Sequence, residues 1–264
     1  MIYAIGIEFL GGNYRGWQRQ AHLTNTVQET LETAFTQVAN TPIEIIAAGR
    51  TDAGVHASHM IAHFATNAQR PPYNWLRGVN SLLPNDIAVH SIHIMPDDFH
   101  ARFSATARRY HYITLPSTHR PAILHGQVTH HHADLDIVAM RLGCAQLLGW
   151  HNFTSFRAAA CQSRQPVRHV LHASLEMVGN LLVLDITANG FLHHMVRNIM
   201  GALFAIGEHK LPPNAISELL HLQDRTQAPP TASPDGLYFV GASYPERFNA
   251  YFPPAFRPPI WLAR

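Results

Sequence analysis

The sequence predicts an α+β fold in which one order of elements, β-α-β-β-α-β, occurs twice. Some stretches alternate apolar and polar residues, as half-buried strands do, and others repeat apolar residues every three or four positions, as amphipathic helices do. The chain has 264 residues, of which 47% are hydrophobic and 14% are charged. That length and composition suffice for a sizeable core in one large domain or two smaller ones.

The first half of the chain holds six expected elements. Thr26 and Glu29 form a capping-box pattern, which predicts a helix that starts there and buries apolar residues spaced by three and four. Another expected helix stops before Pro84, because proline cannot continue it. In chain order we expect a strand at 2–9, the capped helix, strands at 43–48 and 57–65, a helix at 74–83 and a strand at 87–95.

The second half repeats this order with one helix added. Gly179-Asn180 predicts a hairpin turn between two strands. The strongest helical pattern covers 191–206, and a weaker one at 135–148 has apolar residues at 135, 138, 142 and 147. In chain order we expect a strand at 108–115, a helix at 135–148, strands at 167–178 and 181–187, helices at 191–206 and 215–222, and a strand at 237–244.

Each half therefore has the ferredoxin-like order of elements. We expect the two halves, 1–103 and 104–245, to join into a mixed, mainly antiparallel sheet with a central cleft where ligands bind. The remaining 246–264 form a tail rich in proline and aromatic residues, which we expect to pack on the body or on a second subunit.

Composition restricts the setting of the protein. No apolar run approaches the roughly 18 residues that cross a bilayer, and the first residues lack the basic start of a signal peptide. We therefore expect a cytoplasmic protein with no membrane partner. Cys144 and Cys161 are the two cysteines, too few for a disulfide framework or a multi-cysteine zinc site. Lys210 is the one lysine among 19 basic residues; the arginines suit contacts with RNA phosphates, or reflect a genome-wide preference for arginine codons.

A glycine-rich loop carries the clearest chemical signal. The stretch 49–57 reads Gly-Arg-Thr-Asp-Ala-Gly-Val-His-Ala and lies between two expected strands. Gly49 and Gly54 fit tight turns, and Asp52 would stand at the end of a sheet. An isolated Asp-x-Gly is an ordinary turn, but this pattern is longer than a turn requires. We interpret the loop as a candidate active site with one carboxylate.

The loop resembles the signature of the tRNA pseudouridine synthase A family. Four further stretches resemble other signatures of that family, so the resemblance extends from residue 1 to about 245. They are 103–112 (Phe-Ser-Ala-Thr-Ala-Arg-Arg-Tyr-His-Tyr), 152–157 (Asn-Phe-Thr-Ser-Phe-Arg), 191–198 (Phe-Leu-His-His-Met-Val-Arg-Asn) and 236–238 (Gly-Leu-Tyr).

The resemblance implies a pseudouridine synthase fold and a homodimer that isomerises uridine in the anticodon stem-loop of tRNA, at positions 38–40, without a cofactor. It implies that Asp52 is the catalytic aspartate, and it leaves open whether Asp52 attacks the base, attacks C1′ or assists elimination. Tyr110 would stack on the uracil and handle its proton, although a tyrosine in a strand can equally be a core residue. Arg197 would pair with Asp52, Arg50 would fill the space left by the flipped base, and Leu237 would contact the substrate.

Arg197 lies in the helix expected at 191–206. Counting by three and four places it beside His193, His194 and Gly201, off the apolar stripe. A group of further arginines could bind tRNA phosphates, although each can equally be a solvated surface charge. They are Arg15, Arg19, Arg77, Arg108 and Arg109.

Two other functions would also use residues of this sequence. A metal-dependent hydrolase could use His56, His59 and His63 or the run 130–132. In a strand, however, His56 faces away from His59 and His63, so the three cannot converge, and we expect no metal site. A non-enzymatic RNA-binding module would bind RNA through aromatic residues on its sheet, but no aromatic pair of that kind is evident.

Overall fold

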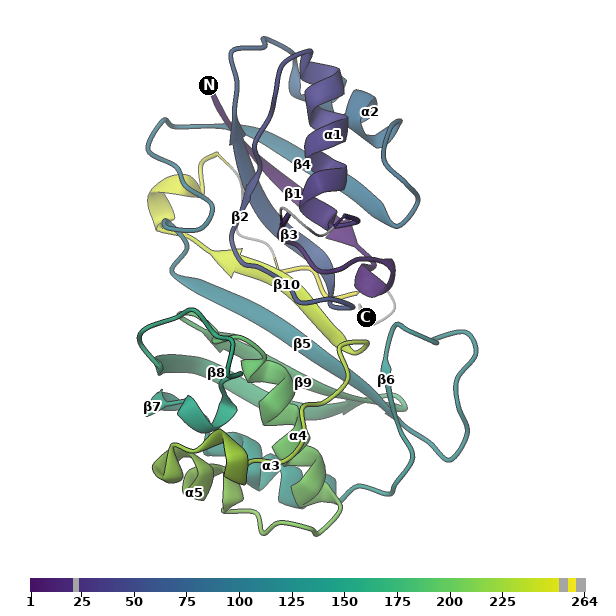
Figure 1. Cartoon of the computed structure of the whole chain (residues 1–264), viewed down its shortest axis with the longest axis vertical. Helices are drawn as coiled ribbons and strands as arrows, with labels where there is room; N and C mark the ends of the chain where they lie inside the picture. Colours follow the sequence, from purple (N-terminus) through teal and green to yellow (C-terminus); the bar gives the residue numbers. More distant parts are fainter. Residues whose placement is uncertain (21–23, 252–255, 260–264) are drawn as a thin grey trace. The chain divides into compact units, whose positions relative to one another are not determined.

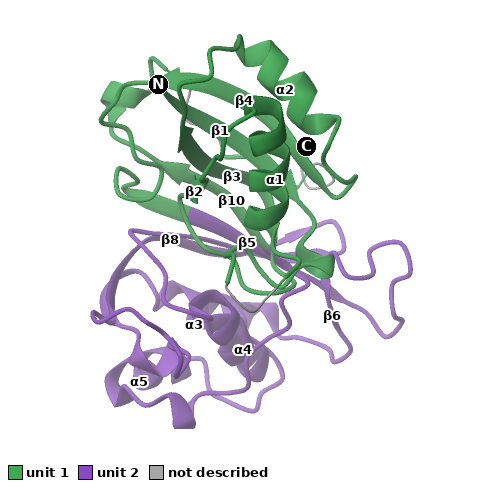
Figure 2. Cartoon of the chain, turned by 45° about the horizontal axis from the view of Figure 1, so that its top comes forward, with its two compact units in different colours: residues 1–108, 238–264 green, residues 109–237 purple. Residues whose placement is uncertain are grey.

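The computed structural model describes residues 1–20, 24–251 and 256–259. The chain divides into two compact units, unit 1 with 1–108 and 238–264, and unit 2 with 109–237 (Figure 2). These units differ from the halves expected at 1–103 and 104–245, because unit 1 extends to residue 108 and also takes up the chain from residue 238 onward. The described residues contain no helix that is both long and apolar enough to span a membrane.

Unit 1 contains a mixed sheet with the strand order β4-β1-β3-β10 (Figure 1). The central strand β1 runs antiparallel to both β3 and β4, β2 pairs with β3 antiparallel, and β10 pairs with β3 in parallel. The strands are β1 (Ile2–Phe9), β2 (Ile46–Ala47), β3 (His56–Ala65), β4 (Ile87–Met95) and β10 (Leu237–Ser243, of which Leu237 belongs to unit 2).

Two helices, α1 (Val27–Ala39) and α2 (Pro72–Asn80), cover one face of this sheet. Tyr3 of β1 stacks on Phe64 of β3 at 5.2 Å between ring centroids, and Phe35 of α1 and Trp75 of α2 contact Phe64 at 4.9 and 5.2 Å. These rings are almost fully buried, and such aromatic packing stabilises the unit beyond the area it buries. The expected cap is confirmed, since the Thr26 side chain accepts a hydrogen bond from the backbone N–H of Glu29.

The strands of unit 2 belong to the same ten-stranded sheet and follow in the order β5-β9-β8-β7, with β6 beside β5. β8 is antiparallel to β7 and β9, and β6 is parallel to β5. The elements are β5 (Ala107–Pro116, whose first two residues belong to unit 1), β6 (Thr129–His131), α3 (Ile137–Ala145), β7 (Gly149–Asn152), β8 (Val167–Val178), β9 (Leu181–Ala188), α4 (Met195–Gly207) and α5 (Ala215–Leu222). The α+β class and the twofold order of elements are confirmed, and β6 and β7 are additions that the sequence pattern did not predict.

Two helices of unit 2 differ from their predictions. The helix expected from residue 191 begins at Met195, because His194 adopts a left-handed conformation with φ of 62°. In α3, Val138 and Leu142 were expected on the apolar face, yet they are 67% and 57% exposed. A Cβ at Gly143 would lie 2.8 Å from Ile206, so α3 packs on α4 through the face that carries Met140 and Gly143, and Val138 and Leu142 lie on the opposite, exposed face.

Candidate active site

A tight turn in unit 1 presents Asp52. The backbone N–H of Val55 donates to the carbonyl oxygen of Asp52 at 3.2 Å. Gly54, the third residue of this turn, has φ of +81°, a conformation that glycine adopts without steric cost. Val55 is buried and Asp52 is half-buried. The carboxylate therefore stands on a hydrogen-bonded turn between β2 and β3, the inter-strand position that the sequence predicted for it.

A neighbouring segment, 11–17, holds the turn from the side. The N–H of Trp17 donates to the carbonyl of Thr51 at 3.0 Å. A Cβ at Gly11 would lie 1.9 Å from the carbonyl oxygen of Val55, and one at Gly16 would lie 2.8 Å from that of Thr51. Only residues without a side chain allow this approach, so both glycines help to position the loop of Asp52.

His56 anchors the far end of the loop. Its Nδ1 accepts a hydrogen bond from the N–H of Gly11 at 2.9 Å, and its ring lies 4.7 Å from that of Tyr238 in β10. Because Nδ1 is the acceptor, this nitrogen carries no proton. His56 is 1% exposed, and its role in unit 1 is structural.

Arg108 connects the start of the Asp52 loop to the segment 102–105 of unit 1. Its Nε donates to the carbonyl of Ala48 at 3.1 Å, and its other nitrogens donate to the carbonyls of Ala105 and Arg102. These contacts give Arg108 a structural role in addition to the phosphate contact expected of it. Arg50, next to the turn, is exposed to solvent.

Tyr110 lies in β5 with its ring edge against Phe191, at 4.9 Å between centroids and an interplanar angle of 79°. It is 8% exposed, so Phe191 fixes the orientation of a largely buried ring. Leu237, at the start of β10, is 5% exposed. The preceding residue, Gly236, accepts a hydrogen bond from Ile113 at 2.8 Å through its carbonyl.

Arg197 lies in the first turn of α4 and is clamped by the segment 230–232. Its Nε donates to the carbonyl of Ala232 at 2.8 Å, and its own carbonyl accepts from the N–H of Ala232. A Cβ at Gly201, one turn later, would lie 2.1 Å from the carbonyl of Pro230. The clamp sets the direction of the guanidinium within unit 2.

The next residue, Asn198, is a structural centre that the sequence reading did not identify. It is 1% exposed. Its side chain donates to the carbonyl of Phe156 at 2.8 Å and accepts from Thr231 at 2.6 Å and from Arg225 at 3.2 Å. The family-like stretches 152–157 and 191–198 therefore meet through Asn198. Its place inside the second of these stretches is the signal in the sequence that could have identified it.

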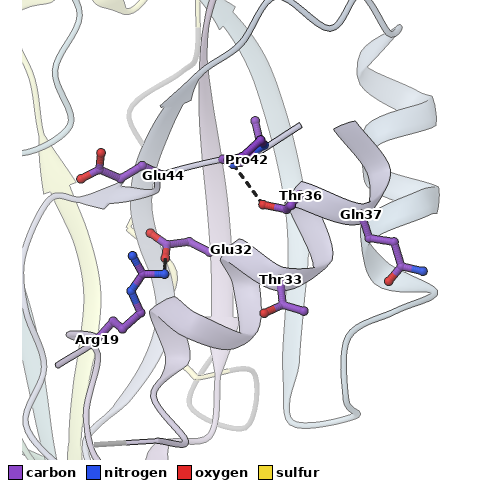
Figure 3. A pocket seen from close by; sticks show the side chains of 8 residues that line it. Arg19, Glu32, Thr33, Thr36, Gln37, Pro42 and Glu44 are labelled. Atoms are coloured by element: carbon purple, nitrogen blue, oxygen red, sulfur yellow. Dashed lines mark hydrogen bonds and ion pairs between the residues drawn. The ribbon is translucent and has the colours of Figure 1, made fainter. Parts of the chain in front are cut away.

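The remaining arginines occupy different surroundings. Arg15 and Arg77 are exposed to solvent. Arg19 pairs with Glu32 at 3.0 Å beside an open pocket (Figure 3). Glu32 is 4% exposed, so Arg19 neutralises a buried carboxylate.

Arg109 makes a two-pronged contact with Asp185, with Nε donating to Oδ1 at 2.7 Å. Burial raises the pKa of Asp185, but the hydrogen bonds from Arg109 and the nearby His111, whose Nε2 lies 3.6 Å from Oδ1, outweigh it and hold the pKa below its ordinary value. Arg109 is thus committed to a salt bridge in unit 2.

The histidines of β3 have separate partners. His59 lies 3.0 Å from His90, measured from Nδ1 to Nε2, and His63 accepts from the N–H of Ala101 at 3.2 Å. His56 in turn accepts from the N–H of Gly11. Each of the three histidines therefore has a different partner, and they do not converge as the ligands of a metal-dependent hydrolase would. His130 and His131 lie in β6.

Comparison with known proteins gives concordant results. A family model described as tRNA pseudouridine synthase matches 5–104 and 144–245. The tRNA pseudouridine synthase A of Acinetobacter baumannii strain ATCC 17978 is 53% identical over 260 residues, which cover 98% of this chain and 97% of the relative. The proteins of the same name from Acinetobacter baylyi and Escherichia coli O1:K1 are 54% and 51% identical, covering 94% and 98% of this chain and 91% and 95% of the relatives. Among solved structures, a Cbf5-Nop10-Gar1 complex matches with a TM-score of 0.35 and 11% identity, over 90% of this chain and 48% of that chain.

Proposed function

The chain belongs to the tRNA pseudouridine synthase family, and we propose that it modifies uridines of the anticodon stem-loop with Asp52 as the residue that acts on them. The enzyme isomerises uridine to pseudouridine in tRNA. The observation that carries the assignment of Asp52 is the fixed turn that presents its carboxylate, braced by Gly11, Gly16 and Trp17.

The reaction breaks the bond from N1 of uracil to C1′ of the ribose and forms a bond from C5 to C1′. A proton leaves C5 and one is taken up at N1, so no electrons are gained or lost overall. An aspartate can act as the nucleophile in such chemistry. Whether Asp52 attacks the base, attacks C1′ or assists elimination, the carboxylate is regenerated, and we expect no cofactor to be required.

The uridine must leave its stack first, which costs a few kcal/mol. We assign Tyr110 to stack on the uracil and to handle its proton, which offsets part of that cost because stacking is worth roughly 1–3 kcal/mol per base. Exposed Arg50 would fill the space that the base leaves, and Leu237 would contact the substrate. Arg197 would be the ion-pair partner of Asp52, with its Nε already oriented by Ala232.

We assign tRNA phosphate binding first to Arg15 and Arg77, because both are exposed. Arg19, Arg108 and Arg109 would contribute less, since each also has a structural partner. Charge-assisted contacts of this kind position RNA but do not read its sequence.

We propose that the enzyme works as a homodimer in the cytoplasm. The apolar residues Val138 and Leu142, four positions apart on the outer side of α3, support an interface on unit 2. Cys144 and Cys161 are free thiols, which fits a reducing compartment. Burial, with a contribution from Glu176, raises the pKa of Cys144 to about 12, so its thiol stays protonated.

The test is to incubate the purified protein with an unmodified tRNA transcript and to map pseudouridine by carbodiimide labelling and primer extension. We expect modification in the anticodon stem-loop, undiminished after dialysis against a chelator. Modification confined to another part of the tRNA would refute the proposed target. Activity that disappears on chelation and returns with zinc would refute the cofactor-free reaction.

A further inference from the structure

An exposed aromatic ring stands beside an arginine in unit 1. Phe103 is 75% exposed, although side chains of this kind are usually buried. The guanidinium carbon of Arg102 lies 5.5 Å from the centroid of the Phe103 ring, within the range of a cation–π contact. Arg102 is exposed as well, and in the described ranges 1–20, 24–251 and 256–259 it has no carboxylate partner.

The backbone that carries this pair is firmly held. His100 accepts hydrogen bonds at Nδ1 from the N–H groups of Arg102 and Phe103, at 3.2 and 3.1 Å. The N–H of Ser104 donates to the carbonyl of His100 at 2.9 Å, and the Ser104 hydroxyl accepts from the N–H of His100. The rings of His100 and Phe103 lie 4.3 Å apart. The loop therefore fixes the aromatic side chain in an exposed position instead of burying it.

Arg108 ties this loop to the backbone of the catalytic loop. It donates to the carbonyls of Arg102 and Ala105 on one side and of Ala48 on the other. Ala48 directly precedes the glycine-rich stretch that contains Asp52. Since these contacts lie within unit 1, the Phe103 ring is held at a defined position relative to the catalytic loop.

We propose that Arg102 and Phe103 form a stacking subsite for an unpaired base of the tRNA substrate, outside the site of isomerisation. Any base presents a π face to an aromatic ring, and the unpaired guanidinium complements the adjoining phosphate. A purely apolar partner would leave that charge unmatched. The subsite rests on the tRNA specificity of the family and adds a contact that positions the RNA.

The test compares Phe103→Ala, Phe103→Leu and Phe103→Trp, with Tyr73→Leu as the control. Tyr73 is a 65% exposed aromatic of the same unit. We expect the Kd and KM for an unmodified tRNA transcript to rise about tenfold for alanine and leucine, because both remove stacking. Tryptophan should retain wild-type values, kcat at saturating tRNA should change little in all of them, and the control should match wild type. Arg102→Gln should lower the salt dependence of binding by about one phosphate contact.

The leucine variant separates stacking from simple apolar contact. If Phe103→Leu binds tRNA as wild type does, or if Phe103→Ala leaves Kd and KM unchanged, the proposal is overturned. A change in oligomeric state on sedimentation with unchanged tRNA binding would identify the ring as part of a protein interface and would also overturn it. Should the alanine variant fail to fold by circular dichroism, the comparison of leucine with tryptophan still decides. Failure of the proposed target would appear as wild-type enzyme that modifies tRNA outside the anticodon stem-loop. Failure of the subsite would appear as variants whose Kd and KM equal those of the wild type.

Discussion

Asp52 and its surroundings show how much of one residue's role depends on the backbone around it. The carboxylate lies on a turn that Gly54 permits and that Trp17 and Val55 brace by hydrogen bonds. Asp52→Asn preserves the shape of the side chain and removes the nucleophilic charge. We expect turnover to fall on the order of 10⁴-fold or more while tRNA binding stays near the wild-type value. Pseudouridine formation over multiple turnovers by the purified variant would contradict the assignment.

Arg197 supplies a second prediction at the residue scale. Arg197→Met keeps much of the bulk, but it removes the charge and the hydrogen bond from Nε to Ala232. We expect a rate loss of about 100-fold, similar to the loss of one preorganised donor. Arg197→Lys restores the charge without the planar fork and should recover only part of the rate. Near-normal single-turnover rates in both variants would reduce Arg197 to a structural helix residue.

At the scale of elements, glycines decide how closely the segments of unit 1 approach the catalytic loop. Gly16 has φ of +91°, and a Cβ there would meet the carbonyl oxygen of Thr51 at 2.8 Å. We expect Gly16→Ala to destabilise the protein by roughly 1–2 kcal/mol and to lower kcat, because the strain falls on the backbone beside Asp52. Gly12→Ala is the matched control, since a Cβ at Gly12 meets nothing within 4 Å. Urea unfolding and kcat measured on both variants test this, and equal effects would contradict it.

The same elements indicate what the sequence could predict and why. Features that depend on neighbouring residues could be predicted: the Thr26 cap, the Gly179-Asn180 hairpin and α5 all lie where the pattern placed them. The start of α4 could not be predicted, because no pattern in the sequence indicates the left-handed conformation of His194. The outward face of α3 was missed because residues 138 and 142 have helical spacing, but so do the buried Ala139, Met140 and Gly143, which face α4 instead.

The candidate site divides in a similar way. The motif at 49–57 is longer than a turn requires, and this was enough to propose Asp52 as the candidate residue. The partners of Arg109 and Arg108 could not be inferred, because Asp185 and Ala48 lie far from them along the chain. Pairing between distant residues depends on the fold, and local periodicity carries no information about it.

At the scale of the whole molecule, the proposed homodimer can be tested by changing the exposed side of α3, where we place the interface. Leu142 is 57% exposed there. Leu142→Glu would place a charge in an apolar interface, and we expect the variant to sediment as a monomer at concentrations where the wild type is a dimer. Glu218→Gln, a charge change on α5, serves as the control. A dimer that persists in the Leu142→Glu variant would place the interface elsewhere.

Buried histidines make the stability of the protein depend on pH. His90 reaches His59 across Gly6 of β1, where a Cβ would lie 2.4 Å from the His90 ring. Burial, with help from the neighbouring charges, lowers the pKa of His59 to about 3 and that of His90 to about 4. His63 is similar, with burial and nearby His100 lowering its pKa to about 4.

These histidines stay neutral in the folded protein and become protonated in the unfolded chain below about pH 6.5. The unfolded state then binds more protons, so the free energy of unfolding falls as pH drops from about 6.5 toward 4, by up to about 1.4 kcal/mol per pH unit for each histidine. Urea midpoints at pH 7.5, 6.0 and 5.0 measure the slope. The double variant His59→Gln with His90→Gln should have a shallower slope, whereas His119→Gln, at an exposed position, should keep it. Equal slopes in all three proteins would mean that the His59–His90 pair does not set the acid limit of the fold.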